Sequence, residues 1–394
     1  MLIKLNFMPQ SPRCLNVPRI SELLLRICCL YGTVFGVITF GIERKENSQL
    51  VARDRRGYRW FCVIIRLLAS FFYGYSYEAW AGQYATDWYL RVFFMLRLAG
   101  CLVCSAIILV MQLRFAEELL GLVNTYLELF QRLKWLTKGG GSSGFGGSHE
   151  LVLLSFKAIS LLFVFLAFRL QLSPWILLTI VCDFYTSIST GMIMHFCFIG
   201  YLSVGILYKD LNNYVDCQLK AQLGSLNCEE HRQPSRQAIK SLDKCLALYE
   251  DIYQVTRRFQ NLFDLPLFLT LAQSLSAMAM VSYHAILRGQ YIFSLWGLVI
   301  KLLIDVVLLT MSVHLAISGS RLVKRLSLEN YYVTECKRYH IKMDLFLGRL
   351  NHQELRVRPL GLFEVSNELT LFFLSAMVTY LTFLVQYGMQ SRPV

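Results

Sequence analysis

The chain has 394 residues, of which 55% are hydrophobic, and its mean hydropathy is +0.46. A soluble domain has no need for several separated apolar stretches of about twenty residues, whereas a membrane protein needs one such stretch for each helical span. The formal net charge of +13 lies mainly between the apolar stretches, which indicates cytoplasmic loops rather than a nucleic-acid-binding surface.

Residues 1–57 are predicted to form a cytoplasmic N-terminal region that carries one apolar segment at 21–42. Basic residues lie on both sides of this segment, so both of its ends are expected to face the cytoplasm. We therefore predict a membrane-associated or re-entrant helix, with Gly32 and Gly36 interrupting its regularity. A first span at 21–42 is the alternative, because this segment is more apolar than residues 58–80.

Seven further apolar stretches are predicted to cross the membrane: 58–80, 89–113, 150–172, 174–207, 262–287, 292–318 and 367–388. The connections between them alternate between strongly basic and nearly uncharged. Placing every basic connection in the cytoplasm gives a cytoplasmic N-terminus and an extracellular C-terminus. The predicted fold is thus all-α, with seven transmembrane helices and long cytoplasmic helical extensions.

The same pattern divides the chain into regions. Spans one to four occupy 58–207, with a flexible cytoplasmic Gly/Ser-rich linker at 139–148. A cytoplasmic helical connection covers 208–261, and spans five and six follow at 262–318. A second cytoplasmic connection covers 319–366, and 367–394 holds the last span and a short extracellular tail. Apolar periodicity at 114–136 predicts an amphipathic helix that continues the second span, and 234–262 has the same pattern.

The last apolar stretch carries a polar stripe formed by Thr379, Thr382 and Gln386. Their i, i+3, i+7 spacing places them on one face of a helix. Such groups are costly in hydrocarbon unless they meet protein or water. They can therefore line a water-filled pore, or they can hydrogen-bond a neighbouring helix.

The run Thr379-Tyr380, five mostly apolar residues and Gln386 resembles the signature of insect gustatory receptors. That signature continues with an aromatic residue, usually Phe, where this chain has Tyr387. The preceding segment, Gly361 to Ser366, is similar to the family's lead-in to its last helix.

The resemblance implies a ligand-gated, non-selective cation channel in which four subunits surround a pore lined by the last helix. Thr379, Thr382 and Gln386 would line or gate the pore, and Tyr380 and Tyr387 would pack against adjacent helices. The implied partners are a small-molecule tastant (a bitter compound), membrane lipid, and sister receptors in a homo- or hetero-tetramer. The implied location is the plasma membrane of gustatory receptor neurons.

Charged residues within the spans are candidates for a ligand pocket. Lys301 and Asp305 are spaced i, i+4 and are expected to neutralise each other. Asp183 has no local basic partner and lies near Tyr185 and Thr186 in the predicted extracellular half. A basic partner from another span would instead give Asp183 a structural role.

The sequence carries no catalytic motif and no phosphate-binding glycine loop, so we expect no enzyme activity, cofactor, metal site or nucleic-acid partner. Three alternatives stay open. An odorant receptor of the same superfamily would share the topology, a G-protein-coupled receptor would have an extracellular N-terminus, and a secondary transporter would use the charged residues within the spans.

Overall fold

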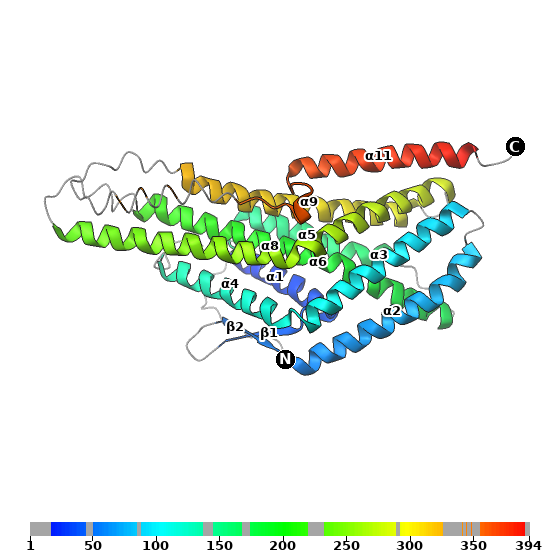
Figure 1. Ribbon diagram of the computed structural model, residues 1–394, viewed down its shortest axis with the longest axis horizontal. Coiled ribbons are helices and arrows are strands. Elements are labelled where there is room, and N and C mark those ends of the chain that lie inside the picture. The colour runs from blue at the N-terminus through cyan, green and yellow to red at the C-terminus, as the bar shows by residue number, and fades with distance from the viewer. Residues whose placement is uncertain are drawn as a thin grey trace.

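The computed structural model of the protein describes residues 17–44, 50–84, 88–136, 145–167, 174–219, 232–288, 292–325 and 355–390, with residues 341, 344 and 348. Long helices run side by side and form an elongated bundle (Figure 1). They are α1 (Val17–Val34), α2 (Arg56–Tyr84), α3 (Trp88–Leu113), α4 (Ala116–Leu136), α5 (Ser148–Ala167), α6 (Pro174–Tyr214), α8 (Arg232–Arg288), α9 (Ile292–Arg325) and α11 (Asn367–Gln390). A π-helical turn, η1 (Val215–Leu219), follows α6, and a 3-10 turn, η3 (Pro359–Gly361), precedes α11.

The prediction of a mostly helical membrane protein is confirmed. Each stretch predicted to span the membrane overlaps a separate helix, in the order α2, α3, α5, α6, α8, α9 and α11. Four described segments are long and apolar enough to cross a bilayer: Met95–Leu113, Tyr185–Leu219, Lys240–Tyr283 and Trp296–Arg321. The number of crossings and the sides on which the termini lie stay predictions.

The protein is not strictly all-α, because a hairpin links α1 to α2. Strands β1 (Phe40–Arg44) and β2 (Leu50–Asp54) pair antiparallel. An isolated two-stranded hairpin is marginally stable in water, so it needs support from other elements. Asn124 of α4 supplies this support, since its side-chain amide accepts a hydrogen bond from the Ala52 nitrogen at 2.7 Å and donates one to the Ala52 oxygen at 3.2 Å.

The prediction of one apolar helix over 21–42 is wrong at its C-terminal end, because α1 stops at Val34. Gly36 has a φ of +67°, which is the left-handed conformation that glycine adopts after a helix. The amides of Val37 and Ile38 donate back to the carbonyl of Gly32, at 2.9 and 3.0 Å. These bonds close the last turn, and the chain then leaves the helix for β1.

The helices predicted between the spans are present, with different bounds. The helix expected to continue the second span is a separate element, α4, whose buried face consists of Leu122, Tyr126, Leu129 and Leu133. Residues 234–262 belong to α8, a single helix of 57 residues. At about 1.5 Å per residue, α8 is far longer than the roughly 30 Å of a bilayer core. Most of the linker predicted at 139–148 and much of the 319–366 connection lie outside the described residues.

The core is centred on α6, which packs against α9, α8, α2, α3 and α4. Aromatic rings join three of these helices: Phe259 of α8 meets Tyr201 of α6 and Tyr126 of α4, with centroids 5.2 and 6.4 Å apart. By contrast, α11 lies along the outer edge of the bundle and packs on α8 and α9 (Figure 1).

Candidate functional sites on the last helix and in the bundle core

One narrow face attaches α11 to the rest of the chain. Leu369 and Phe373 are buried on this face, 5% and 3% exposed. The hydroxyl of Thr370 lies 3.2 Å from that of Thr310 in α9. Leu371 and Phe372, on the sides away from this seam, are more than 60% exposed. Most of the surface of α11 is therefore left uncovered by the described part of its chain.

The predicted polar stripe lies opposite the attached face. With 100° of turn per residue, Ser375, Thr379, Thr382 and Gln386 fall within about 60° of one another and point away from Phe373. All four are exposed. The hydroxyls of Thr379 and Thr382 donate to carbonyls of the preceding turn, both at 2.9 Å, which leaves their oxygen lone pairs facing outward. The stripe thus presents neutral hydrogen-bond acceptors to whatever lies beyond the chain.

The two tyrosines assigned to packing differ in what the structure describes. Tyr380 is 56% exposed, so no helix among the described residues covers its ring. The side chain of Tyr387 lies outside the described residues. The predicted packing of both tyrosines against adjacent helices stays a prediction.

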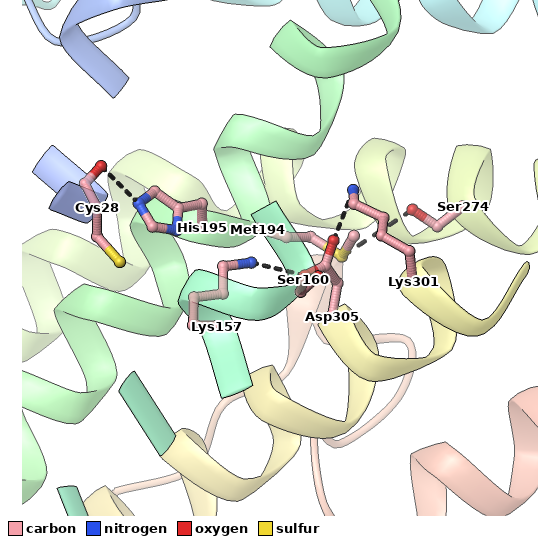
Figure 2. Close-up of polar contacts among 8 residues, drawn as sticks. All are labelled: Cys28, Lys157, Ser160, Met194, His195, Ser274, Lys301 and Asp305. Carbon is pink, nitrogen blue, oxygen red and sulfur yellow. Dashed lines mark hydrogen bonds and ion pairs between the residues drawn. The ribbon is translucent and has the colours of Figure 1, made fainter. Parts of the chain in front are cut away.

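The expected Lys301–Asp305 pair is present and belongs to a larger buried cluster (Figure 2). The carboxylate of Asp305 lies 2.7 Å from the ammonium of Lys301 and 2.7 Å from that of Lys157 in α5. Ser160, also in α5, donates to the same carboxylate at 2.8 Å. On the other side of Lys157, Nε2 of His195 lies 3.2 Å from the carbonyl oxygen of Cys28 in α1. The sequence pattern predicted the pairing of Lys301 with Asp305 but not the participation of Lys157.

The other pocket candidates lie on α6. Tyr185 is half-buried, with its ring 5.4 Å below the guanidinium of Arg66 and 6.3 Å from the ring of Phe35. Thr186 is buried, and its hydroxyl donates to the Cys182 carbonyl at 2.7 Å. Asp183 is part of α6, but its side chain lies outside the described residues. The structure therefore brings Tyr185 against the end of α1 rather than into an open cavity.

A group of side chains around the end of α1 was missed from the sequence. Arg66 of α2 is 1% exposed and donates to the Phe35 carbonyl at 3.1 Å. Gln112 of α3 donates to the next carbonyl, that of Gly36, and the hydroxyl of Tyr58 donates to the carbonyl of Thr33. Because these donors come from two helices, they hold the last turn of α1 inside the bundle. The presence of Arg66 and Gln112 within apolar stretches is the sequence feature that could have indicated these contacts.

The hollows among the described residues include a small cavity and an open depression. The cavity, of about 30 Å³, lies beside the turn after α1, between Val37, Gln112 and Phe263, and holds no more than about one water. The depression lies along Arg91–Ala99, and the described residues that line it all belong to α3. It is therefore an open surface feature rather than an enclosed pocket.

Comparison with known proteins decides the family. A family model described as 7tm chemosensory receptor matches residues 25–391. The chain is 70% identical to the candidate gustatory receptor 93b of Drosophila melanogaster, with 98% of each chain covered. It belongs to the gustatory receptor family of insect 7tm chemosensory receptors.

The receptor is also similar to other chemosensory receptors. It is 38% identical to the candidate gustatory receptor 93c of the same fly, over 96% of this chain and 98% of the relative. It is 23% identical to the fly's gustatory receptor for bitter taste 93a, over 93% of this chain and 92% of the relative. The fold is similar to that of the olfactory receptor OR5 of Machilis hrabei in complex with eugenol, with a TM-score of 0.62. The two sequences are 11% identical, and the comparison covers 94% of this chain and 100% of the olfactory receptor chain.

Proposed function

We propose that the receptor is a subunit of a ligand-gated, non-selective cation channel that detects tastants, with bitter compounds as the ligand class. The observation that carries this proposal is the position of the α11 stripe. Four polar residues face away from the only seam that attaches α11 to the described part of its chain. A channel of four subunits would place four such stripes around one axis, where neutral oxygens can contact partly hydrated cations.

The proposed topology has seven spans, with a cytoplasmic N-terminus and an extracellular C-terminus in the plasma membrane of gustatory receptor neurons. The homo- or hetero-tetramer would cover the exposed apolar residues beside the stripe, which include Leu371, Phe372 and Phe383. Tyr380 would then pack on a helix of the neighbouring subunit. The bitter ligand class is supported by one relative, receptor 93a, which is a gustatory receptor for bitter taste.

The ligand is proposed to bind among the spans, near Asp183, Tyr185, Thr186, Lys301 and Asp305. The buried charges of Lys301 and Asp305 support this location, because polar groups inside a membrane bundle are costly and often mark binding sites.

Cysteine accessibility tests the pore assignment. Thr382 and Phe383 are adjacent and both exposed, but they point about 100° apart. In cells that respond to a bitter-compound panel, a charged, membrane-impermeant thiol reagent should reduce the current of Thr382→Cys and of Gln386→Cys, and leave Phe383→Cys unchanged. Equal modification of all three positions, or of none, would remove the stripe from the pore wall.

Alanine substitution provides a second measurement. Gln386→Ala should change single-channel conductance or gating, since it removes the amide from the stripe. Gln254→Ala is the matched control, because Gln254 is also exposed but bonds Glu250 on α8. Unchanged currents in both variants would contradict a pore role for Gln386.

A further inference from the structure

The buried cluster around Asp305 contains more positive than negative charge. It combines the ammonium groups of Lys157 and Lys301 with the carboxylate of Asp305. The Lys157 and Asp305 side chains are each 1% exposed, and that of Lys301 is 9% exposed. With all three groups ionised, the cluster has a surplus of one positive charge.

The described neighbours do not supply the missing negative charge. Ser160 donates a hydrogen bond to Asp305, and Nε2 of His195 must donate to the Cys28 carbonyl, because a carbonyl oxygen only accepts. The ring of Phe198 lies 5.9 Å from the Lys157 ammonium, which gives a favourable but weak interaction. An ammonium in a region of low dielectric is costly unless an anion balances it.

Both lysines also have donors to spare. An ammonium has three N–H donors, and the described contacts of each lysine use one of them, on Asp305. Gly191 of α6 lies beside Lys301. A Cβ added at Gly191 would lie 3.4 Å from the ammonium nitrogen, in van der Waals contact. The less buried of the two lysines therefore approaches α6 at a residue that has no side chain.

We propose that Lys157 and Lys301 form a binding site for one monovalent anionic group, with Lys301 as its main contact. The group is a small inorganic anion or the carboxylate of an acidic ligand, since both neutralise one charge and accept ammonium hydrogen bonds. A cationic group fits less well, because it would add to the surplus positive charge. A divalent anion also fits less well, because its two negative charges exceed the single surplus positive charge. The carboxylate case deepens the proposed ligand pocket and rests on that proposal, whereas anion binding itself can be measured without channel currents.

The first test uses the purified full-length receptor in lipid nanodiscs. Thermal unfolding is followed at constant ionic strength while chloride, or separately acetate, replaces the bulky organic sulfonate MES, which carries no carboxylate. Binding to the native state should raise the unfolding temperature in a saturable way, by about 2 °C or more at saturation. A rise with chloride alone identifies an inorganic anion site, and a rise with acetate as well shows that a carboxylate is accepted. Identical melting in all three media would overturn the proposal.

Variants assign the effect to the cluster. Lys301→Gln removes the surplus charge, so it should abolish the saturable rise while melting in MES at or above the wild-type temperature. Gly191→Ala leaves the charge unchanged but places a methyl group against the Lys301 ammonium, so it should weaken the rise. Lys209→Gln is the control, because Lys209 pairs with Glu150 at 2.7 Å and is 47% exposed; it should keep the full rise.

Two results would contradict the assignment. Equal destabilisation of Lys301→Gln in MES and chloride would mean that Lys301 only packs the core. The second is a wild-type receptor whose unfolding temperature does not respond to anions, combined with strong destabilisation by Asp183→Asn. This result would make the Asp183 carboxylate the group that balances the surplus charge. A saturable anion effect in a protein that conducts no current would instead preserve this inference and count against the channel proposal.

Discussion

Nη2 of Arg66 donates a 3.1 Å hydrogen bond to the carbonyl oxygen of Phe35, and Gln112 donates to the adjacent carbonyl of Gly36. The final carbonyls of a helix have no partner within the helix and carry partial negative charge. Here a buried arginine and a buried glutamine from two other helices bind the carbonyls that follow α1. The turn after α1 is therefore held inside the bundle rather than exposed at its surface.

Replacing Gln112 with leucine should loosen this turn. The variant leaves the Gly36 carbonyl buried without its side-chain donor, which costs about 1–3 kcal/mol of unfolding free energy. Amide hydrogen exchange should accelerate at Gly36–Ile38. Gln254→Leu, at an exposed position on α8, should change stability by less than about 0.5 kcal/mol. Unchanged exchange in Gln112→Leu would show that Arg66 alone holds the turn.

Gly36→Ala should destabilise the receptor by about 1–3 kcal/mol, for two reasons. The φ of +67° is unfavourable for alanine, and the added Cβ would lie 3.0 Å from the sulfur of Cys62 and 3.2 Å from the hydroxyl of Tyr185. The matched control is Gly74→Ala within α2, where a Cβ meets nothing within 4 Å. The control should gain up to about 1 kcal/mol in thermal unfolding, because alanine is favoured inside a helix. Equal melting temperatures of the two variants would rule out this explanation.

Asp305→Asn should be the most damaging single change among these tests. It removes the only carboxylate that pairs with Lys157 and Lys301 among the described residues, and a buried charge left without its partner costs about 3–5 kcal/mol. The yield of monodisperse protein and its unfolding temperature should both fall. Glu364→Gln breaks the more exposed pair with Arg358 and should cost less than about 1 kcal/mol. Comparable losses in the two variants would argue against a buried cluster.

Leu360→Gly should stabilise the turn before α11. Leu360 has a φ of 51°, where a non-glycine residue costs about 1–2 kcal/mol, and its side chain is 43% exposed, so little packing is lost. Its amide donates to the Asp264 carboxylate at 2.9 Å, a bond that glycine retains. Leu362→Gly, at an exposed position with a φ of −78°, should give no such gain in thermal unfolding. A loss of stability in Leu360→Gly would mean that its side chain is covered in the assembled receptor.

The sequence by itself determined the helical membrane class and the polar face of α11, since both follow from local patterns. Apolar stretches of span length predict helices wherever they occur, and the spacing of Thr379, Thr382 and Gln386 fixes a shared face once the helix forms. The signature that contains Gln386 also pointed to the family. Pairing of Lys301 with Asp305 was predictable for the same reason, because i and i+4 positions are neighbours on any helix.

Only the tertiary structure decided which distant residues meet. Lys157 lies 148 positions from Asp305, and the two are brought together because α5 packs on α9. Arg66 and Phe35 meet only because the turn after α1 lies against α2 and α6. Local periodicity carries no information about such contacts, since they depend on how separate helices pack. The surplus charge around Asp305 is therefore a property of the folded bundle, whereas the stripe on α11 is a property of one helix.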